Sequence, residues 1–323
     1  MKIIHKAKPV LFSSLLVFNF AIQGCTKNDN DSAANLQKVT CENGKAIAAG
    51  IFGGEKVNSQ SNLAKGMVLI YHAQGALGGS FCTGSLIDSN IILTAAHCVP
   101  AKGEKPEVVS VFWSVDPLCT VIQNGDESQV RIAEKIIVHP SYGNADSPEH
   151  GDVALIRISD VAPPEAIPAT LVAQTEKLNS DSKIMVAGFG KTTDYTNFEF
   201  SRQQMRFAMV KPFQGIAESS KDDVAKETRD LLKENLFFDQ TGGHGACAGD
   251  SGGPSLLNLD GTWAIIGVAS YVDPLKGKEF ANKETTCRQG VAYSSVVYFK
   301  KWIQKSFLEL RNDNSKFGLR WTK

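Results

Sequence analysis

The chain has 323 residues, and its 34 basic and 34 acidic side chains cancel to a formal net charge of zero. This length is enough to bury a sizeable core in one or two domains. The balanced charge gives no sign of a nucleic-acid partner and no electric field that would steer a charged substrate.

Residues 1–25 are predicted to be an export signal with a basic start. The apolar run at 10–22 is well short of the roughly 20 residues that a membrane-spanning helix needs. Its end at Cys25 resembles the lipobox of bacterial lipoproteins. That resemblance implies a lipid anchor on Cys25 in the bacterial cell envelope, at the outer membrane because Thr26 rather than Asp follows. The alternative is an ordinary secretory signal that happens to end in cysteine.

The segment 26–50 is expected to be a tether or propeptide. Its first part, 26–40, is polar and lacks apolar periodicity, which is typical of a flexible linker. We therefore expect the folded domain to begin after this segment.

Short apolar runs separated by glycine and polar residues predict strands from Met67 onward. The expected strands are several within 67–99 and one each in 108–113, 130–138, 184–188 and 262–271. A proline-rich stretch at 162–168 is the expected crossover between two halves. Two helices are predicted: an inserted one at Ser220–Leu236, capped by Ser220 with Asp223, and a closing one at Ser295–Leu310.

The glycine-rich segment around Ser251 predicts a tight turn with uncovered backbone N–H groups. Glycine and proline in 249–254 disfavour a helix or a regular strand interior. Converging N–H groups suit a negatively charged oxygen, and Ser251 among them is a candidate nucleophile if a base lies nearby. The alternative is an ordinary glycine-rich surface loop.

A base and an acid appear elsewhere in the chain. His97 ends an apolar run, and Asp152 comes directly before a strand, where a partly buried carboxylate would need a partner such as His97. The order His97, Asp152, Ser251, together with the residues that flank each of them, resembles the trypsin/chymotrypsin-like serine proteases. The resemblance extends from residue 51 to about 305. The resemblance implies that Ser251 attacks a peptide carbonyl, His97 is the base, Asp152 orients it, and the Gly249 and Ser251 N–H groups hold the oxyanion.

The same resemblance implies an all-β fold. We expect two six-stranded antiparallel β-barrels within a peptidase domain at 51–323, the first at about 51–165 and the second at about 166–300, followed by the helix at about 295–310. Protein or peptide substrates, no cofactor and a monomer are expected. No metal site is expected either, because two acids in the polar loop at 126–127 are more often simply solvated.

Ile51-Phe52-Gly53-Gly54 resembles the mature N-terminus of this family. The resemblance implies a zymogen that is cut between Gly50 and Ile51, after which the new Ile51 ammonium pairs with Asp250. No Arg or Lys precedes the cut, so a trypsin-type activator is not implied. The alternative is a strand start with a Gly-Gly turn.

Four residues are expected to form the specificity pocket. Gly245 lies where trypsin-like members carry Asp, which disfavours Arg or Lys at the P1 position of the substrate. Ser270 and Val272 align with the pocket wall, and Gly290 lies in the strand that faces it. Because Val272 replaces a glycine, small aliphatic P1 residues are expected. A deep pocket that admits Phe or Leu is the alternative.

Seven cysteines leave an odd count. The resemblance implies the disulfides Cys82–Cys98 and Cys247–Cys287. With Cys25 lipidated, only Cys41 and Cys119 remain, and we infer that they pair with each other. Two unpaired thiols, or pairing between molecules, are the alternatives.

Two other classes of function compete with an exported protease. One is a protease-like binding protein with a silent site. The other is a membrane-anchored adhesin that uses the Ser220–Leu236 helix.

Overall fold

The computed structural model describes residues 51–74, 79–100, 105–143, 150–174, 178–179, 181–192, 204–213, 233–273, 286–288, 290–312 and 314–322. The expected export signal and tether, with Cys25 and Cys41, lie outside these residues. None of the helices in the described part has the length and apolar character that a membrane crossing requires.

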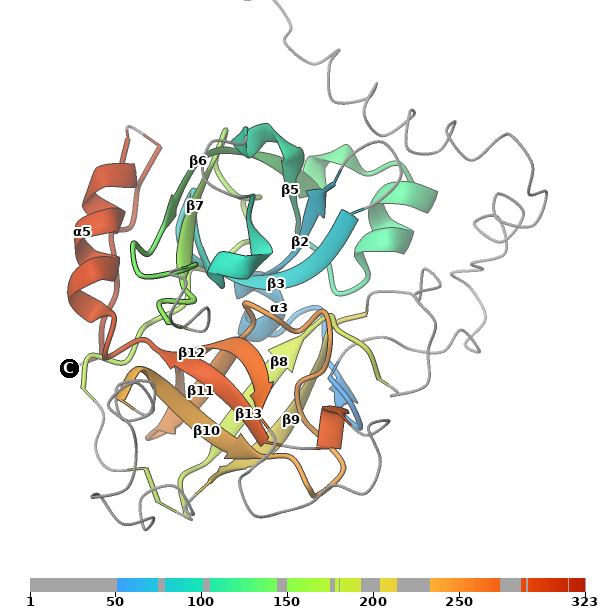
Figure 1. The fold of residues 1–323 in the computed structure, drawn as a ribbon. Coiled ribbons are helices and arrows are strands. Elements are labelled where there is room, and N and C mark those ends of the chain that lie inside the picture. Colours follow the sequence, from blue (N-terminus) through green and yellow to red (C-terminus); the bar gives the residue numbers. More distant parts are fainter. Residues whose placement is uncertain are drawn as a thin grey trace, which may run out of the picture.

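The first half of the chain closes into a six-stranded antiparallel barrel in the order β2-β3-β4-β7-β6-β5 (Figure 1). Buried Val, Ile and Leu side chains from its strands form the core of the barrel. The strands are β2 (Met67–Ala73), β3 (Gly79–Asp88), β4 (Ile91–Thr94), β5 (Val109–Phe112), β6 (Val130–Val138) and β7 (Ala154–Ile158).

The second half closes in the same way, because β8 pairs with both β9 and β11. The expected pair of six-stranded antiparallel barrels is therefore confirmed. The strands of this barrel are β8 (Ile184–Gly188), β9 (Arg206–Pro212), β10 (Asn235–Asp239), β11 (Pro254–Leu259), β12 (Thr262–Asp273) and β13 (Gly290–Ser295).

The first residues of the domain pack with the second barrel, although they precede the first barrel in the chain. The short strand β1 (Glu55–Lys56) pairs with β9, and Ile51 lies in the core of the second barrel. The strands of the first barrel begin only at Met67, so the expected start of that barrel near residue 51 is too early. The N-terminal end of the domain is thus part of the second barrel.

The described part of the chain has few helices. Its named α-helices are α3 (Asn62–Gly66) and α5 (Lys300–Leu310). The 3-10 helices are η1 (Ala96–Cys98), η2 (Pro106–Val108), η4 (Glu127–Gln129) and η5 (Thr286–Arg288), and η3 (Leu118–Gln123) is a π-helix.

Both predicted helices need correction. The closing helix begins at Lys300 rather than Ser295, because Ser295 still pairs with Gly267 at the end of β13. Most of the expected inserted helix lies outside the described residues, and Lys233 and Glu234 near its end are helical. Of its described residues only the last two differ, because Asn235 and Leu236 belong to β10, where Leu236 pairs with Tyr293 of β13.

The segment after α5 ties the two barrels together. Leu171, in the crossover, pairs with Ile265 of the second barrel and with Trp321 near the end of the chain. The same tail reaches the β3–β4 turn of the first barrel, where the Lys316 N–H donates to Ser89 Oγ at 2.9 Å. Helix α5 buries Ile303, among other residues, in the core cluster that includes the first barrel.

Candidate active site

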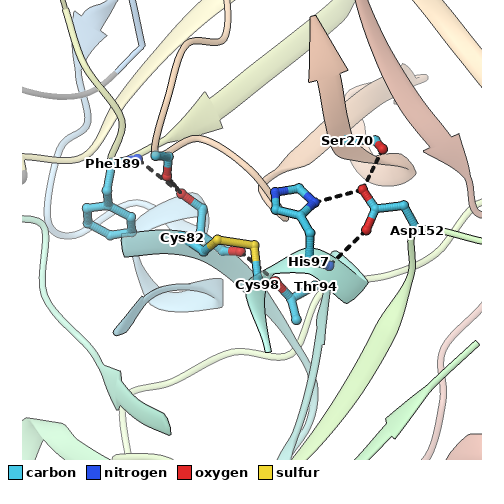
Figure 2. The surroundings of a disulfide bond; sticks show 9 residues. Cys82, Thr94, His97, Cys98, Asp152, Phe189 and Ser270 are labelled. Atoms are coloured by element: carbon cyan, nitrogen blue, oxygen red, sulfur yellow. Dashed lines mark hydrogen bonds and ion pairs between the residues drawn. A yellow bond between two sulfur atoms is a disulfide. The ribbon is translucent and has the colours of Figure 1, made fainter. Parts of the chain in front are cut away.

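His97 and Asp152 are brought together by two neighbouring strands of the first barrel. His97 lies in η1, just after β4, and Asp152 lies just before β7, which pairs with β4. The His97 Nδ1 atom lies 2.8 Å from Asp152 Oδ2, and the His97 backbone N–H donates to Asp152 Oδ1 at 3.0 Å (Figure 2). One carboxylate therefore fixes both the ring and the backbone of His97.

A disulfide anchors the turn that carries His97. Cys98 is bonded to Cys82 of β3, with an S–S distance of 2.04 Å, as expected (Figure 2). Cys82, His97 and Cys98 also form a cluster of potential metal ligands. Because both sulfurs are consumed in the disulfide, they are not free thiolates for a metal.

Ser270 of β12 completes the surroundings of Asp152. Its hydroxyl donates to Asp152 Oδ2 at 2.5 Å (Figure 2). The sequence analysis assigned Ser270 only to a pocket wall and missed this contact, because nothing in the sequence pairs a strand of the second barrel with Asp152. The carboxylate thus holds residues from both barrels.

The electrostatics of the pair favour an ionised acid beside a basic ring. Burial opposes charge on Asp152, but its hydrogen bonds with His97 and Ser270 outweigh burial and lower its pKa. Burial would also lower the pKa of His97, yet the hydrogen bond and charge of Asp152 raise it above the ordinary value. The His97 side chain is 33% exposed, so its ring remains open to a reactant.

The turn with Ser251 is tied to the strand that leads to His97. The backbone N–H of buried Thr83 donates to the Ser251 carbonyl at 2.7 Å, and its hydroxyl donates to the Gly249 carbonyl at 3.1 Å. The Thr94 hydroxyl, three residues before His97, donates to the Thr83 carbonyl at 2.9 Å. Thr83, which the sequence analysis did not single out, therefore joins the Ser251 turn to the His97 strand.

The Gly249 and Ser251 N–H groups remain available to a reactant. Within the described part of the chain, neither of them donates a backbone hydrogen bond, although the neighbouring Asp250 N–H is bonded to the Cys247 carbonyl. Two unused donors in one tight turn are what an oxyanion requires.

Asp250 is buried beneath this turn. Its Oδ1 accepts the Gly190 N–H at 2.7 Å and its Oδ2 accepts the Cys247 N–H at 2.8 Å. Burial raises the pKa of Asp250 to about 7, although both N–H groups oppose the shift. Ile51 is fully buried, and Phe52 next to it exchanges two backbone hydrogen bonds of 2.9 Å with Gly245.

This pKa predicts how the stability of the uncut chain depends on pH. The Asp250 carboxyl titrates near 3.8 when unfolded and near 7 when folded, so the folded state binds its proton more tightly. Its contribution to the free energy of unfolding is therefore full below about pH 4 and is lost by about pH 7, a decrease of up to about 4 kcal/mol.

The measurement is urea unfolding between these pH values in a Ser251→Ala background, which prevents self-cleavage. Asp250→Asn in the same background is the comparison, because other groups, including His97, titrate identically in both. If the two chains depend on pH in the same way, Asp250 is not the titrating group.

Gly245, one of the expected pocket residues, lies next to a buried amide that the sequence did not predict. Gly245 has φ +152°, and a Cβ there would lie 2.2 Å from Gln240 Oε1. Gln240 is fully buried, accepts the Ala246 N–H at 2.5 Å and donates to the Cys287 carbonyl at 3.3 Å. The expected Cys247–Cys287 disulfide is present beside it. No pattern in the sequence marked Gln240.

The other two pocket residues lie on the paired strands. Val272 of β12 is opposite Val291 of β13, and Gly290 is opposite Asp239 of β10. A valine therefore faces Val272, which places two branched side chains next to each other.

Cys119 is also disulfide-bonded, and its partner lies outside the described residues.

The two acids at 126–127 lie a few residues after Cys119 in the chain. Asp126 caps η4, because its Oδ1 accepts the Ser128 N–H at 3.2 Å.

Comparison with known proteins gives one family. A family model described as Trypsin matches residues 51–303. The chain is 31% identical over 267 residues to melanization protease 1 of Drosophila melanogaster, covering 76% of this chain and 64% of that protein. It is 29% identical over 266 residues to serine protease Hayan of the same species, covering 76% and 40%.

A further relative is chymotrypsin-like elastase family member 1 of Macaca fascicularis, which is 30% identical over 237 residues, with 71% of this chain and 80% of that protein covered. The chain thus spans less than two thirds of the two Drosophila relatives and most of the macaque one.

Proposed function

The chain belongs to the trypsin family of serine proteases, and from this we propose that it is a serine endopeptidase in which Ser251 forms an acyl-enzyme. The observation that carries the proposal is the Asp152 carboxylate, which binds the ring and backbone of His97 and the Ser270 hydroxyl at once. That arrangement sets the tautomer of His97 and stabilises the imidazolium that a general base becomes.

The reaction follows from these positions. Ser251 Oγ attacks the scissile carbonyl while His97 Nε2 takes its proton, and His97 then gives that proton to the leaving amine. Water then attacks the acyl-enzyme in the same way, with His97 again as the base. The N–H groups of Gly249 and Ser251 stabilise the developing oxyanion, and each such donor contributes about 3 kcal/mol in comparable sites. A fluorophosphonate probe that labels the wild type at Ser251, together with hydrolysis of a peptide, tests the proposal.

Activation is proposed to follow a cut between Gly50 and Ile51. Ile51 is already buried in the second-barrel core, and Asp250 is a buried carboxyl with no cationic partner among the described residues. A free Ile51 ammonium would supply that charge. N-terminal sequencing of the active protein identifies the cut.

Export is proposed from the disulfides, which form in oxidising compartments. The bond at Cys119 fits the proposed Cys41–Cys119 pair, which would keep the segment before Ile51 attached after the cut. With a lipid on Cys25, that segment would hold the enzyme, as a monomer, at a bacterial outer membrane.

The proposed P1 preference is for small apolar residues. Gly245 provides no acid for Arg or Lys, and the pairing of Val272 with Val291 supports a narrow pocket. Hydrolysis of peptides with Ala, Val, Phe and Arg at P1 tests this preference directly.

Gly245→Asp is expected to destabilise the protein without creating cleavage after Arg. The new side chain would meet Gln240 Oε1 in a backbone conformation that only glycine adopts easily. We expect the free energy of unfolding to fall by about 2 to 5 kcal/mol. Gly243→Asp is the matched control, because Gly243 has φ +86° but an open Cβ position. A Gly245→Asp protein as stable as this control, with new activity after Arg, would contradict the expectation.

A further inference from the structure

Asp152 lies at the centre of a tight three-residue turn. The Val153 N–H donates to the Gly151 carbonyl at 2.7 Å, and the Asp152 carbonyl accepts the Ser294 hydroxyl at 2.9 Å. Gly151 has φ +68°, and a Cβ there would lie 2.6 Å from His139 Nδ1, so no other residue fits the turn without strain. The position of the Asp152 carboxylate therefore depends on how this turn is held.

Glu234 holds the turn through its carboxylate. Its Oε2 accepts the Gly151 N–H at 3.2 Å. Glu234 is only 8% exposed and comes from the second barrel, directly before β10, whereas Gly151 belongs to the first. A buried carboxylate is costly unless its hydrogen bonds are satisfied, so its presence next to Gly151 needs an explanation.

Two side chains orient that carboxylate. His150 Nδ1 lies 3.0 Å from Glu234 Oε1, and the Tyr298 hydroxyl donates to the same oxygen at 3.3 Å. With the Gly151 N–H on Oε2, both oxygens of Glu234 are occupied. The Glu234 carboxylate therefore has one preferred position.

The other titratable groups nearby do not replace this partner. His139 packs edge-on against Phe299 and Trp302, and its Nδ1 accepts the Ser141 N–H at 3.2 Å. Burial lowers the pKa of His139, with the charge of Glu234 opposing. Burial raises the pKa of Tyr142, and the charge of Asp152 adds to the rise. Of the histidines near Glu234, His150 is the one whose ring nitrogen lies within hydrogen-bonding distance of the carboxylate.

We infer that Glu234, oriented by His150 and Tyr298, is a positioning residue that holds the Gly151–Asp152 turn and thereby keeps Asp152 against His97. The inference rests on the proposed function. Both contacts of Asp152 with His97 share one carboxylate, so a small movement of the turn weakens both at once.

The test uses the activated full-length enzyme with Glu234→Ala and Glu234→Gln. An amide offers one oxygen where the carboxylate offers two, so Glu234→Gln retains part of the network. We expect kcat to fall by about 10- to 100-fold in Glu234→Ala and by less in Glu234→Gln, with KM nearly unchanged. The acid limb of kcat/KM against pH should move down by about half a pH unit, because His97 loses support from Asp152.

Glu309→Ala is the matched control, since Glu309 forms an exposed ion pair with Lys135 on the surface. It should leave kcat and the pH profile unchanged. If Glu234→Ala does not fold, Glu234→Gln and Tyr298→Phe carry the test. If the folded variants have wild-type kcat and the acid limb of their kcat/KM profile does not move, the inference about Glu234 is overturned but the proposed function is not. A wild-type enzyme that neither hydrolyses peptides nor reacts with a fluorophosphonate would overturn the proposed function, and the inference with it.

Discussion

Ser251→Ala is expected to lower kcat for a peptide substrate by about 10⁶-fold, the size of loss seen when a serine protease loses its nucleophile. The variant lacks the oxygen that forms the acyl-enzyme, while the turn keeps its backbone contacts. In particular, the Ser251 carbonyl still accepts the Thr83 N–H, so KM and the thermal unfolding midpoint should stay close to wild type. Steady-state kinetics and thermal unfolding of the activated protein measure all three quantities.

Labelling with a fluorophosphonate separates this loss from misfolding. The wild type should be labelled and Ser251→Ala should not. Ser255→Ala is the control, because Ser255 is a buried serine in β11 whose hydroxyl has no hydrogen-bond partner in the described residues. It should label like the wild type. Labelling of Ser251→Ala at a rate near wild type would place the reactive serine elsewhere.

Asp152→Asn should lower kcat by about 10⁴-fold near neutral pH, a magnitude taken from the same triad in other serine proteases. The asparagine has one acceptor oxygen where Asp152 now accepts from the His97 backbone, the His97 ring and Ser270. An amide NH₂ that faces Nδ1 would favour the tautomer with its proton on Nε2. His97 could then no longer accept the Ser251 proton.

The pH profile provides a second readout for Asp152→Asn. The wild-type pKa of His97 is raised by Asp152, so kcat/KM should fall as the pH drops through that raised value. Without the carboxylate the acid limb should move to lower pH. Asp160→Asn is the control, because Asp160 is an exposed acid beyond the other end of β7 and should change neither rate nor profile. A profile that Asp152→Asn leaves in place would show that Asp152 does not set the basicity of His97.

Local patterns in the sequence predicted the features that depend on residues close together in the chain. The apolar runs before His97 and after Asp152 predicted strands, and β4 and β7 then bring these two residues together. The Cys82–Cys98 and Cys247–Cys287 disulfides followed from the family resemblance in the same way.

The contacts between the two barrels could not be predicted from the sequence. Ser270, Thr83 and Glu234 each reach the site from a strand or turn far away in the chain, so no spacing or periodicity links them to it. The end of the predicted helix differs for a related reason. Leu236 fits the helical spacing, but pairing with Tyr293 of β13 places it in a strand.

Because the two barrels share the site, an incomplete chain holds only part of it. His97 and Asp152 belong to one barrel, and Ser251 and Ser270 belong to the other. A nascent or cleaved product with a single barrel holds only half of the proposed catalytic residues. If the proposed function is correct, proteolytic activity therefore requires that both barrels have docked, whichever of them folds first.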